Sequence, residues 1–180
     1  MPGAPFLHIV LLNPEIPNNT GNIGRTAAAL GCRLHIVHPI GFSMDDKARR
    51  RAGLDYWHLV DCVEHQSWGA FLAEERPRRL WLLTSHGAQS LYTAKFEPGD
   101  YLLFGKESSG VGPELEAWVA ETYGTEARLR IPQPGTDGLR GTASSEVEAT
   151  PFVRSLNLAT AVAITGYEAF RQLRGTDAPP

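Results

Sequence analysis

The sequence predicts a single α/β domain built on a mostly parallel sheet, with helices on both faces. Short apolar runs alternate with helical segments along the chain, which is typical of parallel sheets. A length of 180 residues suits one domain, and a hydrophobic content of 42% can support a full core. We expect this domain to span residues 1–174, followed by a frayed tail at residues 175–180.

Six short apolar runs predict the strands. The first, at residues 6–12, is unbroken, as in a strand that is buried on both faces. The others are shorter, and turn residues lie between most of them and the next segment. The six runs occupy residues 6–12, 34–37, 59–63, 79–84, 101–104 and 127–131.

Five segments predict helices. The first starts within residues 19–22 and ends at Gly31, so that Arg25 falls in its first or second turn. A cation is unfavourable there, which favours an external anionic partner for Arg25 over a merely exposed side chain. The other helices are expected at residues 45–52, 68–75, 113–120 and 155–173.

N-terminal capping residues support the helices predicted at residues 113–120 and 155–173. Pro113 suits a first helical position, with Ser109 or Gly112 as the cap, and Ser155 is a good N-cap for the final helix. The final helix carries a broad apolar surface, which suits either the core or a dimer face.

The overall charge limits which binding partners the protein can have. With 17 basic and 20 acidic residues the net charge is −3, so contact with a nucleic acid requires a local basic patch. The densest basic cluster consists of Lys47, Arg49, Arg50 and Arg51. It is interpreted either as a solvated helix face or as a contact with RNA phosphates.

The sequence gives no indication of a membrane span, a disulfide framework or a metal site. No run of about 18 apolar residues could cross a membrane, so we expect no membrane contact. Cys32 and Cys62 lack CxxC spacing and predict small core residues in a reducing, cytoplasmic compartment. The six histidines form no HExxH or similar cluster, so the sequence predicts no protein-bound metal.

A glycine-rich turn at residues 104–114 joins a strand to a helix. Gly105, Gly110 and Gly112 let the backbone approach a ligand closely, and the helix start favours anionic or carbonyl groups. The loops at residues 14–25, 84–87, 105–112 and 132–155 are expected at the same edge of the sheet, where α/β folds bind ligands. Three familiar motifs are absent from the sequence. Residues 21–24 lack the GxGxxG spacing of a dinucleotide-binding fold, Glu107 stands where a P-loop needs Ser or Thr, and the GxSxG motif of hydrolases does not occur. Ordinary NAD binding, ATP binding and hydrolase activity are therefore disfavoured.

Three ordered segments resemble the motifs of the SPOUT RNA methyltransferases. They are residues 19–25 (NTGNIGR), 104–110 (FGKESSG) and 154–158 (RSLNL). Residues 14–17 (PEIP) and 51–56 (RAGLDY) further resemble its small single-domain subgroup. Members of this subgroup methylate the ribose 2′-oxygen of the tRNA wobble nucleotide, position 34.

The resemblance implies a trefoil knot in the C-terminal half and S-adenosylmethionine as the cofactor. It also implies a homodimer that uses the last helix, and the anticodon stem-loop of a tRNA as substrate. The target would be cytidine or a modified uridine, with leucine tRNA expected. The implied cofactor pocket comprises Leu83, Thr84, Gly105, Ile131, Ser155 and Leu156.

The same resemblance places Arg25 beside the reacting hydroxyl and the RNA. Its guanidinium is either the general base or the electrostatic partner of the developing oxyanion and adjacent phosphate. Asn22, Glu107, Ser155 and Asn157 would orient Arg25 and the ribose. Without the resemblance they are interpreted as a turn residue, a surface acid, a helix cap and a first-turn polar residue.

One departure from the subgroup is an expected insertion at residues 136–152, directly over the implied cofactor site. It is interpreted as a lid, a tRNA-contacting loop or slack. Two alternative functions remain. One is a related methyltransferase that acts on another tRNA site or on rRNA, and the other is a catalytically silent RNA-binding protein.

Overall fold

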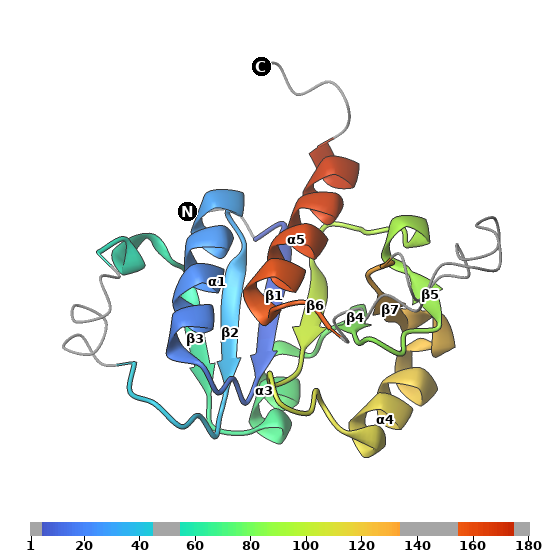
Figure 1. Ribbon diagram of the computed structural model, residues 1–180, viewed down its shortest axis with the longest axis horizontal. Helices are drawn as coiled ribbons and strands as arrows, with labels where there is room; N and C mark the ends of the chain where they lie inside the picture. Colours follow the sequence, from blue (N-terminus) through green and yellow to red (C-terminus); the bar gives the residue numbers. More distant parts are fainter. Residues whose placement is uncertain (1–4, 45–54, 134–154, 175–180) are drawn as a thin grey trace, which may run out of the picture.

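The computed structural model describes residues 5–44, 55–133 and 155–174. In these ranges the chain forms a seven-stranded sheet in the order β3-β2-β1-β6-β4-β7-β5 (Figure 1). Every adjacent pair of strands is parallel. The α/β fold with a parallel sheet is therefore confirmed.

The strands follow the predicted apolar runs, with two differences. A 3₁₀ helix, η1 (Trp57–Leu59), occupies the start of the third predicted run, so that strand begins only at Cys62. The two-residue strand β5 was not predicted, because it is too short to carry a periodic pattern. The strands are β1 (Leu7–Leu12), β2 (Arg33–Val37), β3 (Cys62–His65), β4 (Leu80–Leu83), β5 (Gln89–Ser90), β6 (Asp100–Phe104) and β7 (Arg128–Arg130).

Within the described ranges four α-helices cover both faces of the sheet, and each corresponds to one of the five predicted helices. They are α1 (Pro17–Leu30), α3 (Trp68–Glu75), α4 (Pro113–Tyr123) and α5 (Leu158–Arg174), and two further 3₁₀ turns are η2 (Leu91–Thr93) and η3 (Thr125–Ala127). The helix predicted at residues 45–52 lies outside the described residues.

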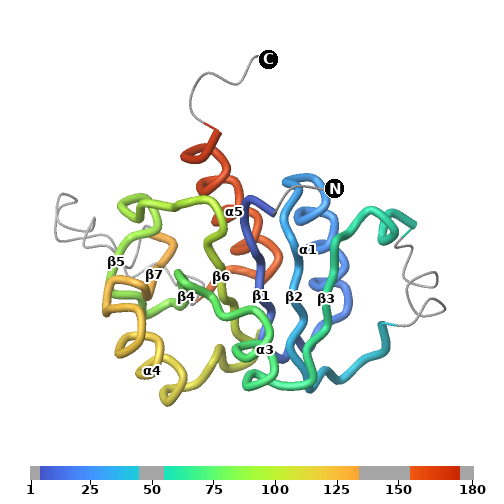
Figure 2. The backbone as a smooth tube through the Cα atoms, turned by 180° about the vertical axis from the view of Figure 1, so that it is seen from behind, coloured from blue at the N-terminus to red at the C-terminus, as the bar shows by residue number. Residues whose placement is uncertain are grey.

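The core has two halves, one on each face of the sheet. Helices α1 and α5 cover one face, and α3 and α4 cover the other (Figures 1 and 2). Buried residues from α1 and α5 include Ile23 and Val162, and those from α3 and α4 include Phe71 and Val119. The helices α1 and α5 pack closely, because a Cβ atom at Gly166 would lie 2.8 Å from Leu30 Cδ1. This packing places the start of α1 beside the start of α5.

Helix α1 begins earlier than predicted, at Pro17 rather than within residues 19–22. Proline is favoured in the first turn because its fixed φ suits the helix and its missing N–H is not needed there. Arg25 therefore lies in the third turn, so its placement in the first or second turn was wrong. The helix dipole consequently says little about its partner. The predicted stop is confirmed, since Gly31 has φ 68°.

The start of α5 also differs from the prediction. Ser155 does not cap this helix, which begins at Leu158. The cap is Asn157, whose Oδ1 accepts hydrogen bonds from the backbone N–H of Ala159 at 2.8 Å and of Thr160 at 3.4 Å. For α4 the prediction is confirmed, since Gly112 is the N-cap and Pro113 starts the helix.

The strand order reverses between β1 and β6, so the loops after these two strands leave the sheet on either side of a crevice. Those loops carry Glu15 and Glu107. No contact of the described residues tests the trefoil knot, and the expected insertion at residues 136–152 lies outside the described residues, so both stay predictions. In the described ranges no helix is both long and apolar enough to cross a membrane.

Candidate active site

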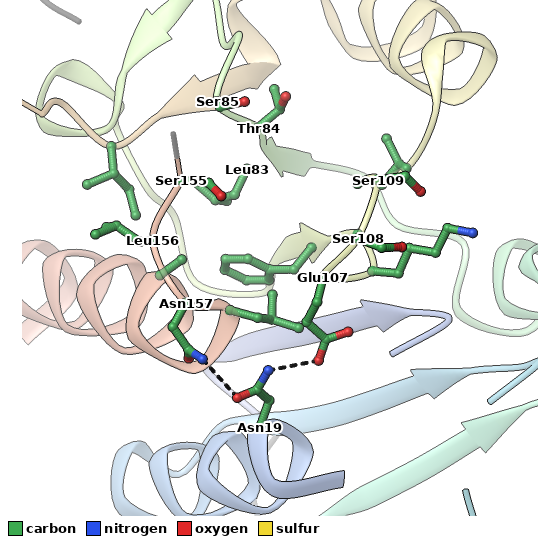
Figure 3. Close-up of a pocket in the computed structure, with 18 of the residues that line it drawn as sticks. Asn19, Leu83, Thr84, Ser85, Glu107, Ser108, Ser109, Ser155, Leu156 and Asn157 are labelled. Carbon is green, nitrogen blue, oxygen red and sulfur yellow. Dashed lines mark hydrogen bonds between the residues drawn. The ribbon is translucent and has the colours of Figure 1, made fainter. Parts of the chain in front are cut away.

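A cavity of about 610 Å³ lies beyond the carboxyl ends of β4, β6 and β7 (Figure 3). Its walls come from the loop after β4, the glycine-rich turn after β6, the end of β7, and the segments that start α1 and α5. Every residue of the implied cofactor pocket lines it, namely Leu83, Thr84, Gly105, Ile131, Ser155 and Leu156.

The glycine-rich turn folds back on itself. The N–H of Gly110 donates to the carbonyl of Lys106 at 2.9 Å, and Gly110 has φ 66°. A Cβ atom at Gly105 would lie 2.2 Å from the carbonyl carbon of Gly110, which no side chain can accommodate. Gly105 therefore permits a backbone turn tight enough to form one wall of the cavity.

Glu107 caps helix α1 from a distant part of the chain. Its carboxylate accepts hydrogen bonds from the backbone N–H of Glu15 at 2.8 Å and of Ile16 at 3.2 Å, and from Asn19 Nδ2 at 2.9 Å. Helix α1 has no side-chain cap of its own, so this carboxylate supplies acceptors near the helix start. The interpretation of Glu107 as a plain surface acid is wrong.

Glu15 makes the reciprocal contact. Its carboxylate accepts hydrogen bonds from the side-chain hydroxyl and the backbone N–H of Ser108, both at 3.0 Å. These two hydrogen bonds, the hydroxyl first, lower the pKa of the Glu15 carboxyl. Two crossed carboxylates thus tie the loop after β1 to the loop after β6.

Asn19 joins the three motif segments. It donates to Glu107, and its Oδ1 accepts from Asn157 Nδ2 at 3.0 Å (Figure 3). Because Asn157 Oδ1 already accepts from the start of α5, the orientation of both amides is fixed. This contact brings together side chains that are 88 and 138 positions apart in the sequence.

The sequence analysis missed Asn19 and named Asn22 instead. Asn19 is only 6% exposed and continues the buried stripe of α1 formed by Ile23, Ala27 and Leu30. A polar residue on an apolar stripe at helical spacing is a signal that could have identified it. Asn22 is exposed and does not line the cavity.

Arg25 also lies outside the cavity lining. It is exposed, and its guanidinium carbon lies 4.2 Å from the ring centroid of Tyr56. The Tyr56 hydroxyl donates to the carbonyl of Gly21 at 2.7 Å, so this aromatic ring is anchored on α1. Arg25 lies six positions after Asn19, which places them about 120° apart around the helix axis.

The structure thus brings together Glu107, Ser155 and Asn157 of the predicted catalytic set, and it leaves Arg25 and Asn22 on another face of α1. The predicted RNA-binding residues Lys47, Arg49, Arg50 and Arg51 lie outside the described residues. Further polar groups in the lining were not predicted. One is Glu116, which accepts a hydrogen bond from the Thr84 hydroxyl at 3.0 Å.

The sequence profile of the SpoU rRNA Methylase family matches residues 6–136, which is more than half of the chain. The chain belongs to the SpoU methylase family. This finding confirms the resemblance to SPOUT RNA methyltransferases that the three motifs indicated.

Similar proteins fall within the same family. The tRNA (cytidine(34)-2′-O)-methyltransferase of Polaromonas sp. (strain JS666) is 48% identical over 170 residues, which cover 93% of this chain and 91% of that protein. A solved structure that concerns 2-OH methylation of C/U34 on tRNA is 45% identical, with a TM-score of 0.72. The match covers 92% of this chain and 95% of the chain in that structure.

A more distant SpoU methyltransferase, AviRb from Streptomyces viridochromogenes, was solved in complex with the cofactor AdoMet. It is 27% identical, with a TM-score of 0.67, and the match covers 93% of this chain and 60% of AviRb. The fold therefore extends to SpoU methylases that are larger than this chain.

Proposed function

We propose that this protein transfers a methyl group from S-adenosylmethionine to the ribose 2′-oxygen of the wobble nucleotide, position 34, of tRNA. The observation that carries the proposal is the contact from Glu107 through Asn19 to Asn157, which joins the three motif segments at one cavity. The name of the Polaromonas relative supports the same reaction and substrate.

The residues of the cavity fit S-adenosylmethionine. A volume of about 610 Å³ lies in the range of small-molecule sites. Leu83, Ile131 and Leu156 offer apolar surface for an adenine ring, while Thr84 and the backbone around Gly105 offer polar groups. Bound there, the cofactor supplies an electrophilic methyl group.

The residues around the cavity have a positioning role. A ribose hydroxyl is a poor nucleophile, so the protein must align it with the methyl group and help it to lose its proton. Glu107, Asn19 and Asn157 fix the geometry of two loops and the start of α5, and Ser155 is exposed at the rim. They hold the wall against which the ribose is placed.

Arg25 acts as an electrostatic partner. A guanidinium has a pKa above about 12 and is a poor base unless strongly perturbed. Arg25 makes no ion pair with another described residue, and its guanidinium lies over the Tyr56 ring. An exposed, unneutralised cation suits the developing oxyanion and the adjacent phosphate.

A homodimer would bring Arg25 to a cavity. Arg25 does not line the cavity of its own chain, so a second copy would have to supply the cavity that it serves. We infer that α5 provides part of the interface, since Tyr167 on this helix is 54% exposed. The cluster Lys47, Arg49, Arg50 and Arg51 would then hold the phosphates of the anticodon stem-loop, in a cytoplasmic enzyme.

The test is methyl transfer from labelled S-adenosylmethionine to unmodified total tRNA, with the labelled nucleotide mapped by nuclease digestion and mass spectrometry. We expect label on a 2′-O-methyl nucleotide at position 34, foremost in leucine tRNA, and none with Arg25→Ala. Arg78→Ala, which removes another exposed arginine, is the matched control and should methylate like the wild type.

Each other outcome selects an alternative. Label elsewhere in tRNA would retain the family reaction and reject position 34, and so would label found only when rRNA replaces tRNA in the same assay. Binding of RNA and cofactor without any label would make this chain a silent RNA-binding protein.

A further inference from the structure

Three histidines lie buried beneath α3, on the opposite face of the sheet from α1 and α5. They are His8 on β1, His35 on β2 and His65 on β3, with exposures of 8%, 0% and 1%. The edge of Phe71 on α3 packs against the rings of His35 and His65. Two carboxylates from the end of α3, Glu74 and Glu75, reach the same cluster.

The hydrogen bonds of this cluster fix the state of one imidazole. His65 Nδ1 lies 2.6 Å from Glu74 Oε2, and a carboxylate can only accept, so Nδ1 of His65 carries its proton. In the neutral ring Nε2 then presents a lone pair. That lone pair faces His35 Nδ1 at 3.0 Å, and His35 Nε2 lies 2.9 Å from His8 Nδ1.

A third donor atom completes a triangle with these two nitrogens. Glu75 Oε1 lies 3.8 Å from His35 Nδ1 and 3.9 Å from His65 Nε2. A tetrahedral metal with bonds of 2.0–2.1 Å holds its ligand atoms about 3.3 Å apart. The three observed separations of 3.0, 3.8 and 3.9 Å bracket that value.

We propose that His35, His65 and Glu75 form a binding site for a divalent transition metal ion of the zinc class. Two imidazoles and one carboxylate suit such ions, and a water would complete the tetrahedron. His8, His35 and Glu75 also have donor atoms within 4.8 Å of one another, so His8 borders the same site.

Each of the three ligands already has an outer partner, as metal-binding side chains usually do. Glu74 accepts from His65, His8 lies against the far nitrogen of His35, and the Tyr101 hydroxyl donates to Glu75 Oε2 at 3.0 Å. Metal binding requires that the proton of His35 moves from Nδ1 to Nε2 and that of His8 from Nδ1 to Nε2, and that the ligating nitrogens of His35 and His65 turn from each other toward the ion. Both rings stay neutral and no proton is released.

Burial favours the neutral, ligating form of these rings. It lowers the pKa of His8 to about 4 and that of His35 to about 2, so both are uncharged at neutral pH. The ion would join β2 and β3 to the end of α3, which is a structural role distant from the methyl-transfer cavity. The sequence predicted no metal because the ligands come from separate strands and a helix, without local spacing.

The experiment is equilibrium dialysis of metal-free protein against Zn²⁺, with bound zinc measured by mass spectrometry. We expect one tightly bound ion per chain. Glu75→Gln, which is isosteric and keeps an acceptor for Tyr101, should bind zinc most weakly. Glu74→Gln keeps an acceptor for His65 but removes the negative charge of this outer partner, and should lower the affinity by about 10–100-fold.

The matched control is His38→Asn. His38 and Glu64 form another histidine–carboxylate contact, at 2.7 Å, but on the surface. This variant should keep the tight site. No stoichiometric zinc in the wild type, unchanged affinity in Glu75→Gln, or loss of zinc only in His38→Asn would each overturn the proposal.

A spectroscopic measurement on the wild type keeps the test independent of whether Glu75→Gln folds. Long-range ¹H–¹⁵N spectra of the histidine rings should show zinc-induced shifts at His35 Nδ1 and His65 Nε2, with the proton of His65 retained on Nδ1. If zinc leaves these nitrogens unshifted, the cluster is only a hydrogen-bonded ladder.

Discussion

Asn19 and Arg25 belong to one sequence motif, yet they face different surroundings. Asn19 is 6% exposed and is held between Glu107 and Asn157 at the cavity. Arg25 is exposed on another side of the same helix and lies over Tyr56. The helix thus divides one sequence motif between two places. Asn19 forms a clamp with Glu107 and Asn157 at the cavity, and Arg25 presents its positive charge on another side of the helix. Among the described residues this cation has no ion-pair partner, which fits the proposal that it serves a second copy of the chain.

The largest expected effect is the loss of methyl transfer when Arg25 is replaced, because this change removes the cation and leaves the contacts of Asn19 intact. Arg25→Ala should lower single-turnover methyl transfer by at least about 100-fold, because the developing negative charge loses its partner. The affinity for S-adenosylmethionine should not change, and the free energy of unfolding should stay within about 0.5 kcal/mol, as for other exposed positions. Unchanged turnover would remove Arg25 from the mechanism.

Asn19→Ala should show the opposite pattern of effects. It leaves the Nδ2 of Asn157 and the carboxylate of Glu107 each short of one partner. We expect the free energy of unfolding to fall by about 1–3 kcal/mol, measured by urea denaturation. Turnover should fall about tenfold as the cavity wall loosens. Asn22→Ala is the stability control, since Asn22 is exposed, and equal stability losses in the two variants would contradict the clamp.

A smaller effect concerns the basic cluster. Reversing the charge of Arg49 and Arg50 together should weaken tRNA binding and reduce the slope of log K against log salt by about 2. The measurement is a filter-binding series at several salt concentrations. If affinity and slope equal those of the wild type, the cluster is a solvated helix face and the RNA path must be sought elsewhere.

The smallest effect concerns the crossed carboxylates. Because the pKa of Glu15 is lowered in the folded state, its contact with Ser108 stabilises the protein above the ordinary pKa of 4.5, and this stability is lost as pH falls through the folded value. The melting temperature of Ser108→Ala should lie below that of the wild type at neutral pH, and the two should converge in acid. A difference independent of pH would mean that the hydroxyl acts by packing alone.

The local elements were the predictable part of the fold. Helix α3 has the predicted bounds of residues 68–75, and all the residues of the implied cofactor pocket line one cavity. The bounds of α3 follow from a pattern within a short stretch of chain, and the grouping of the pocket residues follows from motifs with a fixed order. That these residues bind the cofactor stays a prediction.

The missed features are contacts between distant segments. Glu107 accepts hydrogen bonds at the start of α1 from 91 positions away, so this contact has no local signal in the sequence, although Pro17 itself suits a first helical position. Asn22 was named from the family resemblance, whereas the register of the helix decides which amide faces inward, and that amide is Asn19. The histidine cluster beneath α3 likewise forms only when β1, β2 and β3 pair, because each of these strands contributes one of the three histidines.

The most direct measurement is methyl transfer by mixed dimers of Arg25→Ala and Ser155→Trp. Ser155 is exposed at the cavity, so a tryptophan there obstructs the cavity without disturbing the core. Each variant alone should be inactive. If Arg25 serves the cavity of its partner, an equal mixture should regain about one quarter of the wild-type activity, because half of the dimers are mixed and each holds one intact site. No recovery, with mixed dimers demonstrated by differential tagging, would contradict the division of the motif between two chains.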